Sequence, residues 1–305
     1  MRYWLGPLSL ARHAKPYQNL VNQIQPDIVH ALRIPFEGML GAYTPDRFPF
    51  LVSTWGNDLT LHAKGSPAMG RFTRRCLNRA NGITSDTLRD ARLAKDWGLA
   101  DGTPSLVIPG SGGLDLDAIK NVNEFDPVSY HIPPSRPWVI NPRGIRPGSV
   151  HQEAFFAAIP QVLQHHPQAQ FICPSLKGVS QAEAWVEAFS IQKNMHLLPK
   201  LPQIELWSLF KSCQVFVSPS SHDGTPNTLL EAMACGCLPV VGNIESLREW
   251  IEPHQNGILV NPQDPRQIAE AIIKALRDAD LRRQAARLNM EIIKNRADQS
   301  VTRPM

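Results

Sequence analysis

The chain has 305 residues, which is enough for two domains of ordinary size. Hydrophobic residues make up 43% of the sequence and charged residues 19%, which excludes an intrinsically disordered protein. The formal net charge is only +4. This small excess fits an anionic small molecule or an anionic membrane surface and argues against a nucleic-acid partner. The sequence has no run of 18 apolar residues, so we predict no membrane-spanning helix.

The cysteine pattern does not indicate a metal site. Five cysteines occur at scattered spacings, and Cys235 and Cys237 lack the second ligand pair that a zinc site requires. We therefore predict reduced, buried thiols in a cytoplasmic protein, with no bound metal.

The first part of the chain alternates short apolar runs with polar segments. The N-terminal stretch 1–15 is interpreted as the edge of a folded domain, because its apolar patch is too short for a signal peptide. Strands are predicted at 27–32, 50–55, 82–85 and 105–110, and a helix is predicted over 85–99.

The segment 70–80 carries arginines at helical spacing. Two alternatives stay open for them: a solvated helix face, or peripheral contact with an anionic lipid surface at the inner face of the membrane. The four arginines are Arg71, Arg74, Arg75 and Arg79.

The second part of the chain shows a more regular βα alternation. Asp264 and Pro265 mark the start of its last clear helix, as N-cap and first helical residue. Alternation at this interval favours a parallel sheet with helical crossovers. Strands are predicted at 138–142, 170–174, 195–199, 215–220, 237–242 and 257–260.

These elements predict an α/β protein with two Rossmann-like parallel-sheet domains facing a cleft. We expect a first domain with its linker at 1–133, the linker being the Pro- and Asn-rich stretch 121–137. A second domain follows at 134–285, and a C-terminal helix or tail at 286–305. Ligands of such sheets bind beyond the carboxyl ends of the strands.

One segment beyond a predicted strand begins as a turn and continues as a helix. Thr225 is the expected cap and Pro226 the expected first helical residue, while Gly224 permits the turn. The next three backbone N–H groups have no helical partner and create an anion site with the helix dipole. They belong to Asn227, Thr228 and Leu229.

Two carboxylates flank this anion site. Asp223 precedes the turn and Glu231 lies about one helical turn inside. Ionised carboxylates only accept hydrogen bonds, so they suit hydroxyl groups on either side of a phosphate. A nucleotide sugar has this pattern. The alternative is an ordinary capped helix with two surface acids. An acid/base pair for glycoside hydrolysis is disfavoured, because the carboxylates flank an anion site and do not face each other across a bond.

The segment "SPSSHDGTPNTLLEAMACGCLPVV" resembles the donor-binding motif of the family 4 retaining glycosyltransferases, which have the GT-B fold. In that family an acid, usually Glu, precedes Gly-x-Pro, and a second Glu follows eight positions after the first. The resemblance implies that Asp223 holds sugar hydroxyls at the catalytic centre and that Glu231 binds ribose. It also implies donor binding by His222, Gly224, Thr225, Pro226, Asn227, Thr228 and Leu229.

The stretch "VINPRG" resembles the family's phosphate-binding loop, which would make Arg143 a donor-binding residue. Arg146 stands near the place of a further family lysine, at the wrong offset. Its alternative is a solvated loop charge. The resemblance implies a nucleoside diphosphate sugar as donor substrate and no cofactor.

In the first half, "PDIVHALR" and "STWGNDL" resemble family segments. They imply a catalytic role for His30 and for Asp58, with Gly56 and Asp58 on the acceptor side. A lone histidine on a strand is also an ordinary core residue. Trp55 stands where many members have a histidine base.

The ends of the chain also depart from the family pattern. The segment 1–25 lacks the usual Gly-rich strand and turn, so we expect an incomplete N-terminal domain. The segment 286–305 would be a shortened crossover helix.

Together these features predict a retaining glycosyltransferase that transfers a hexose to a sugar, lipid-linked or small-molecule acceptor. The alternative is a catalytically impaired module that binds a nucleotide sugar or a partner. An epimerase on the same fold is disfavoured by the acid spacing and the Gly-Thr-Pro turn. The sequence leaves the oligomeric state undetermined.

Overall fold

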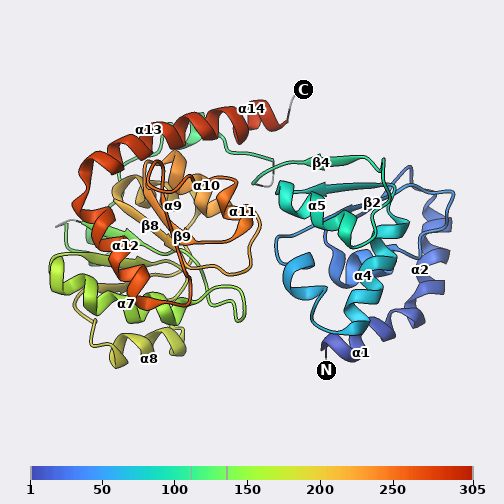
Figure 1. Ribbon diagram of the computed structural model, residues 1–305, viewed down its shortest axis with the longest axis horizontal. Coiled ribbons are helices and arrows are strands. Elements are labelled where there is room, and N and C mark those ends of the chain that lie inside the picture. Colours follow the sequence, from blue (N-terminus) through green and yellow to red (C-terminus); the bar gives the residue numbers. More distant parts are fainter. Residues whose placement is uncertain (1, 111, 135–136, 304–305) are drawn as a thin grey trace. The chain divides into compact units, whose positions relative to one another are not determined.

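A computed structural model describes residues 2–110, 112–134 and 137–303 and contains two compact units (Figure 1). Unit 1 comprises Met1–Ser111 together with His222–Thr225. Unit 2 comprises Gly112–Ser221 and Pro226–Met305.

Unit 1 is built on a four-stranded parallel sheet in the order β1-β2-β3-β4. The strands are β1 (Val29–Ala31), β2 (Phe50–Ser53), β3 (Gly82–Ser85) and β4 (Ser105–Val107). All four lie inside the predicted ranges. The helices are α1 (Arg2–Ser9), α2 (Ala11–Ile24), α3 (Met39–Gly41), α4 (Pro67–Arg79) and α5 (Leu88–Asp96), with the single turns η1 (Ile34–Gly38) and η2 (Asp58–His62).

Local sequence signals account for the helix starts in unit 1. Ser66 caps α4 by accepting a hydrogen bond from the Met69 N–H, and Pro67 occupies the first turn. Thr87 caps α5 in the same way through the Asp90 N–H. The predicted helix over 85–99 is confirmed. The N-terminal stretch, predicted only as a domain edge, forms α1 and α2.

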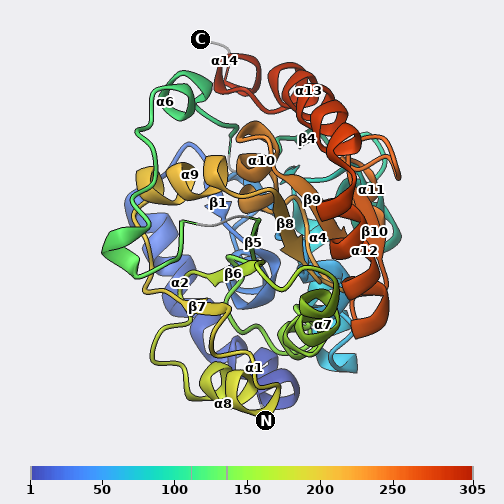
Figure 2. The same cartoon turned by 90° about the vertical axis from the view of Figure 1, so that its left-hand side faces the viewer.

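Unit 2 contains a six-stranded parallel sheet in the order β10-β9-β8-β5-β6-β7 (Figure 2). The chain builds outward from β5 through β6 to β7, then returns to the other side of β5 with β8, β9 and β10. The order therefore reverses between β5 and β8, which is where doubly wound sheets bind ligands. The strands are β5 (Trp138–Ile140), β6 (Gln170–Cys173), β7 (Met195–Leu197), β8 (Val215–Ser218), β9 (Leu238–Gly242) and β10 (Ile258–Val260).

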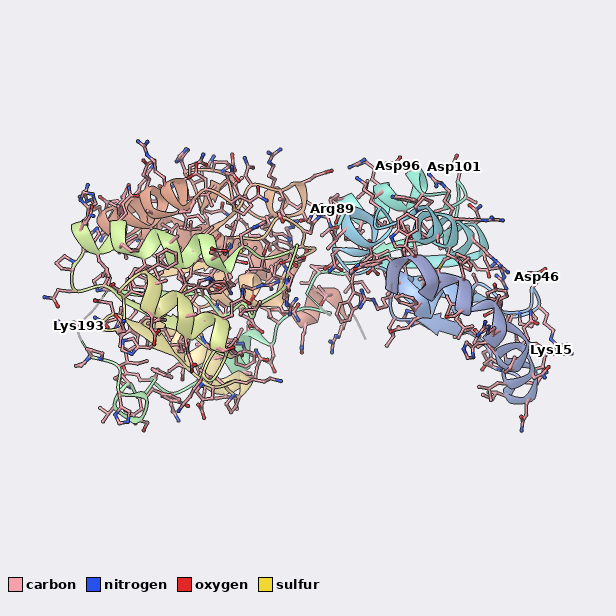
Figure 3. The ribbon with its side chains drawn as sticks, turned by 90° about the horizontal axis from the view of Figure 1, so that it is seen from below. Lys15, Asp46, Arg89, Asp96, Asp101 and Lys193 are labelled. Carbon is pink, nitrogen blue, oxygen red and sulfur yellow. The ribbon has the colours of Figure 1, made fainter. Side chains whose placement is uncertain are left out.

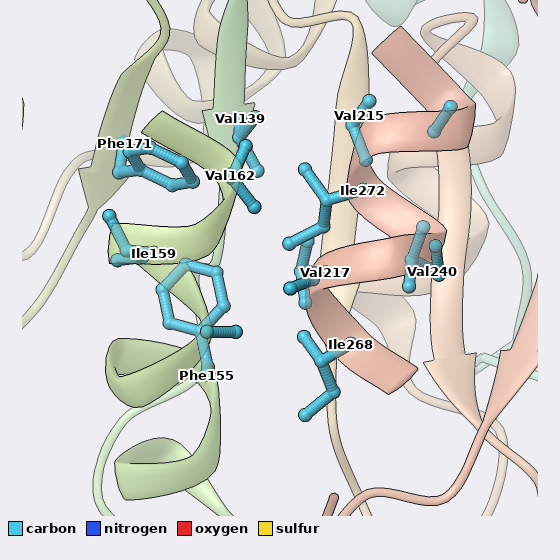
Figure 4. Close-up of a cluster of buried hydrophobic side chains, with 14 of the residues drawn as sticks. Val139, Phe155, Ile159, Val162, Phe171, Val215, Val217, Val240, Ile268 and Ile272 are labelled. Carbon is cyan, nitrogen blue, oxygen red and sulfur yellow. The ribbon is translucent and has the colours of Figure 1, made fainter. Parts of the chain in front are cut away.

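Two buried clusters cover the two faces of this sheet. One cluster packs α7 (Gln152–His165), α8 (Ser180–Ala188) and α12 (Pro265–Arg277) on the sheet. Figure 4 shows its contact between Phe155 and Ile159 of α7, the strand valines, and Ile268 and Ile272 of α12. The other cluster includes α9 (Gln203–Ser212), α10 (Asn227–Ala234) and α11 (Glu245–Arg248).

Continuous apolar strands, buried on both faces, explain why the six strands of unit 2 were predictable. The predicted N-cap of the last clear helix is confirmed, because the Asp264 carboxylate accepts the Arg266 and Gln267 N–H groups.

The expected domain boundaries differ from the observed units. The chain divides at residue 111 and not near 133, because Leu114, Ile119 and Phe125 pack into the core of unit 2. This part of unit 2 also holds α6 (Leu116–Lys120) and η3 (Val128–Tyr130).

The expected tail at 286–305 is not a separate element either. α13 (Ala279–Arg296) runs continuously through residue 285 and contributes to both clusters of unit 2, and α14 (Gln299–Thr302) follows it.

Most charged side chains lie at the surface and most cysteines are buried. The charged side chains of Lys15, Asp46 and Lys193 lie at the outside of their units (Figure 3). All five cysteines are free thiols, and four of them are buried, as predicted. Burial raises the pKa of the Cys235 thiol to about 12, so this group stays protonated at neutral pH.

Candidate functional site

The carboxyl ends of β5 and β8 bring two loops of unit 2 together. Val150 and Ser220 form an antiparallel bridge between these loops. The His151 N–H donates to the Pro219 carbonyl at 2.9 Å, and the Ser221 N–H donates to the Ser149 carbonyl at 2.8 Å. The loop after β5 is therefore fixed to the loop that leads into α10.

Arg143 lies in the loop after β5, and its backbone is held from both sides. Its N–H donates to the Asn141 Oδ1 at 3.0 Å. Its carbonyl accepts a short hydrogen bond from the Gln152 Nε2. The two side chains also bond to each other, at 2.7 Å from the Asn141 Nδ2 to the Gln152 Oε1. Arg143 itself is buried, with 7% of its surface exposed.

The start of α10 differs in detail from the prediction. The helix begins at Asn227, and Pro226 is its N-cap residue, without a side-chain cap. The predicted cap Thr225 is wrong, because the Thr225 hydroxyl donates to the Asp86 carbonyl at 2.6 Å. The Pro226 carbonyl accepts the Leu229 N–H at 2.9 Å, so the prediction that this N–H lacks a helical partner is wrong.

A buried hydroxyl lies at this helix start. Among the described residues, the Thr228 Oγ1 is buried and has no hydrogen-bond partner. Buried polar atoms in native structures are nearly always paired with protein, water or ligand. The orphan hydroxyl therefore favours a polar ligand or water at the first turn of α10.

The turn before α10 groups with unit 1. The Asp223 Oδ1 accepts the Gly224 N–H at 3.2 Å, and His222 and Asp223 are both half-buried. The Thr225 N–H donates to the Asp86 carboxylate at 2.9 Å. Burial raises the pKa of Asp86 to about 7. Asp86 comes one residue after β3, at the carboxyl edge of the sheet of unit 1, a position that could have marked it in the sequence.

Glu231 lies inside α10 and is 5% exposed. Burial raises the pKa of its carboxyl to about 7, although a 2.6 Å hydrogen bond from the Gln203 Nε2 favours the charged form. The buried carboxyl therefore holds its proton more tightly than an exposed glutamate does. Hydroxyl groups of a ligand would donate hydrogen bonds to this carboxylate and stabilise its charged form.

His30 is exposed and begins a polar row of unit 1 whose other two members are half-buried. Its Nε2 is 2.8 Å from the Ser53 Oγ, which is 2.6 Å from the Thr84 Oγ1. The row crosses β1, β2 and β3. The surface position agrees with a binding role more than with the alternative of a core histidine.

Asp58 has a different environment, with no exposed surface. Its carboxylate pairs with the Arg33 Nη2 at 3.0 Å and accepts the Ile34 and Trp55 N–H groups at 3.0 and 3.2 Å. Burial raises its pKa, and Arg33 opposes that shift. Through these contacts Asp58 fixes the backbone at Ile34 and Trp55, which is a structural role. They do not favour the predicted catalytic role. The Gly56 carbonyl likewise accepts from the Arg89 Nη2 at 2.7 Å.

A buried ion pair next to this loop was not predicted from the sequence. The Arg89 Nη2 lies 2.9 Å from the Asp90 Oδ1, and both side chains are almost fully buried. Burial raises the pKa of Asp90 to about 6, despite the attraction of Arg89. Adjacent charges near a helix start resemble an ordinary solvated turn, so the sequence carried no signal for this pair.

The arginines of α4 make contacts within unit 1. The Arg74 guanidinium lies over the Trp97 ring and the Arg75 guanidinium over the Tyr43 ring, at 4.7 and 3.8 Å from the ring centroids. Arg79 donates to the carbonyls of Pro45 and Phe48. These contacts hold Arg74, Arg75 and Arg79 against other residues of unit 1. In the part of the chain that the structure describes, no helix combines the length and apolar character needed to cross a bilayer.

The second half of the chain is similar in sequence to known glycosyltransferases. Residues 149–289 match the family of glycosyl transferases group 1. A D-inositol 3-phosphate glycosyltransferase from Corynebacterium jeikeium is 27% identical over 138 residues, which cover 43% of this chain and 33% of that relative. The match thus spans about a third of the relative's length.

Two solved structures resemble nearly the whole chain. Sucrose-phosphate synthase from Thermosynechococcus elongatus superposes with a TM-score of 0.75 at 16% identity, covering 99% of this chain and 77% of that chain. Anabaena HepE, crystallised with UDP and glucose, gives a TM-score of 0.75 at 17% identity, covering 98% and 80%. The predicted α/β architecture with two parallel-sheet domains of the GT-B type is confirmed.

Proposed function

We propose, from the match of residues 149–289 to the glycosyl transferases group 1 family, that the chain is a glycosyltransferase that binds a nucleoside diphosphate sugar in unit 2. The observation that carries this proposal is the convergence at one edge of the sheet. The Arg143 loop and the loop into α10 meet there through the hydrogen bonds between Ser149 and Ser221 and between His151 and Pro219.

In this proposal the diphosphate lies at the start of α10. The N–H groups of Asn227 and Thr228 and the positive end of the helix dipole offset its charge. Thr228 also offers its buried hydroxyl. The guanidinium of Arg143 adds a positive charge, which stabilises the diphosphate as it departs and removes the need for a metal.

The two acids then bind the ends of the donor. Glu231 accepts hydrogen bonds from the ribose hydroxyls, which gives a role to a carboxyl that lies among the apolar residues of α10. Asp223 accepts from the hydroxyls of the transferred hexose. We further propose retention of configuration, a sugar, lipid-linked or small-molecule acceptor, and a cytoplasmic location, for which the five free thiols are support.

The proposed acceptor residues are in unit 1. His30 heads the polar row with Ser53 and Thr84, and such a row offers hydrogen bonds to a polyol. Asp58, with both carboxylate oxygens already bonded, is proposed to shape the loop that contains Gly56.

A nucleotide-sugar panel tests the proposal. The protein is incubated with UDP-, GDP- and ADP-sugars, with and without acceptors, and released nucleoside diphosphate is measured. Binding is measured separately by calorimetry. Glu231→Ala should abolish binding of the accepted donor, while Glu270→Ala on the surface of α12 is the control. Absence of both binding and release across the panel would refute the proposal.

The second candidate is a module that binds a nucleotide sugar without turnover. It is favoured by the saturated carboxylate of Asp58 and by Trp55, which cannot act as a base, at the position of the family histidine. Donor binding without release under all acceptor conditions would select this candidate.

A further inference from the structure

We propose that Asn141 and Gln152 form an amide clamp that positions Arg143 for diphosphate binding. Both are positioning residues, since they act through Arg143 and not on the ligand. The choice of ligand rests on the proposed function. The clamp itself rests on hydrogen bonds within unit 2.

The orientation of both amides follows from the backbone of Arg143. The Arg143 N–H can only donate, so the Asn141 side chain must turn its oxygen towards it, at 3.0 Å. The Asn141 amide nitrogen then points to the Gln152 oxygen, at 2.7 Å. The Gln152 nitrogen is left to donate to the Arg143 carbonyl, which can only accept. The ring of hydrogen bonds has one consistent arrangement.

The clamp is rigid because it is buried. Asn141 has no exposed surface and Gln152 has 2%. Asn141 continues the sheet through its N–H to the Ile172 carbonyl at 3.0 Å, and Gln152 is the first residue of α7. The ring therefore ties the Arg143 backbone to the central strand β5 and to the helix start.

The Arg143 end of the loop depends on the clamp, because the loop's backbone hydrogen bonds begin further along the chain, where the Ser149 and Val150 N–H groups donate to the Arg146 carbonyl. Pro142 has no N–H, Gly144 precedes the turn at 147–149, and Gly148 lies within that turn. A Cβ added to either glycine would touch nothing within 4 Å, so their surroundings do not hold them. Without the clamp, ordering Arg143 on the ligand would cost conformational entropy.

A neutral clamp also suits an anionic ligand. A carboxylate at position 141 could accept the Arg143 N–H, but it would place a negative charge next to a residue that serves an anion. A carboxylate at position 152 could not donate to the Arg143 carbonyl. Two amides fix the same backbone with no net charge. The residue types therefore match the positioning of a cation that serves a phosphate.

The test compares two substitutions of buried glutamines. Gln152→Met removes the clamp at nearly constant volume. Gln170→Met is the matched control: Gln170 is also buried in unit 2 and bonds to His196 at 2.8 Å, but it begins β6 at the opposite end of the sheet. Hydrogen exchange of peptides covering 141–151 is measured by mass spectrometry. We expect faster exchange in Gln152→Met only.

The second measurement is affinity for UDP, GDP, ADP and pyrophosphate. Gln152→Met should weaken the best binder about tenfold, the magnitude of one buried hydrogen bond, with little change in Gln170→Met. In an Arg143→Ala background, Gln152→Met should cost little more, because a positioning residue has nothing left to position.

The possible results distinguish a failure of the clamp proposal from a failure of the proposed function. If none of the four probes binds the unmodified protein, the proposed function fails, and hydrogen exchange alone decides the clamp. Unchanged exchange at 141–151 in Gln152→Met would overturn the clamp. Equal, additive losses of affinity with and without Arg143 would overturn its role in positioning.

Discussion

Glu231→Gln should make the unliganded protein more stable and bind nucleotide less well. Glu231 is 5% exposed, and burial raises its pKa from 4.5 to about 7. Glutamine has nearly the same shape, keeps an acceptor for the Gln203 Nε2 and carries no charge. The substitution thus removes the cost of a buried carboxylate with minimal repacking.

The magnitude follows from the linkage between protonation and folding. A carboxyl with a raised pKa in the folded state binds its proton more tightly there than in the unfolded chain, so wild-type stability falls as the pH rises from about 4.5 through 7. A rise from 4.5 to about 7 corresponds to about 3 kcal/mol at pH 8. At pH 4 the carboxyl is protonated in both states and the advantage of glutamine disappears.

The assay is urea unfolding of wild type and Glu231→Gln at pH 4, 6 and 8, with UDP, GDP and ADP calorimetry at pH 6 and 8. Wild-type affinity should improve between pH 6 and 8, because the ionised carboxylate is the better acceptor for ribose hydroxyls. Glu231→Gln should bind about 10- to 100-fold more weakly at pH 8 and lose the pH dependence. Equal stability of the two proteins at pH 8, or unchanged affinity, would refute this reasoning.

Three further predictions concern other acids. Asp223→Asn should reduce hexose transfer at least about hundredfold while leaving UDP affinity within about twofold, measured by product release and calorimetry; an equal loss of both would contradict its sugar role. Asp58→Asn should destabilise unit 1 by about 3 kcal/mol in urea, because Arg33 would lose its buried partner; a neutral effect would show that the ion pair is unimportant. Asp264→Ala should cost about 1 kcal/mol through loss of the α12 cap, and Asp264→Ser should restore most of it.

The fold of unit 2 was predictable because its strands are short, apolar and regularly spaced. Val215–Ser218 and Leu238–Gly242 are buried on both faces, and such strands leave a continuous apolar signal. The Asp264-Pro265 helix start was equally clear, since capping depends on neighbours in sequence. The chain division was not predictable, because Pro- and Asn-rich composition does not reveal that Leu114 and Phe125 pack into the core of unit 2.

The candidate site was predictable at the level of motif but not of contacts. Sequence spacing predicted the start of α10 to within one residue and the position of Glu231 inside this helix, both of which depend on local helix geometry. It predicted Thr225 as the cap, and the hydroxyl bonds instead to Asp86, which lies 139 positions away in sequence. The clamp on Arg143 was missed for a similar reason, since Asn141 and Gln152 are 11 positions apart across an irregular loop.

The predicted donor site contains two buried polar groups, of which the Glu231 carboxyl has a hydrogen-bond partner in Gln203 and the Thr228 hydroxyl has none among the described residues. Burial raises the pKa of Glu231. Both groups reduce the stability of the unliganded state, and both would gain partners from a ribose and a phosphate. The same buried groups then lower the stability of the protein and raise its affinity for the ligand, a trade-off that is common at functional sites. The stability gained by Glu231→Gln and the affinity it loses should therefore share their pH dependence, because both report the ionisation of the same carboxyl.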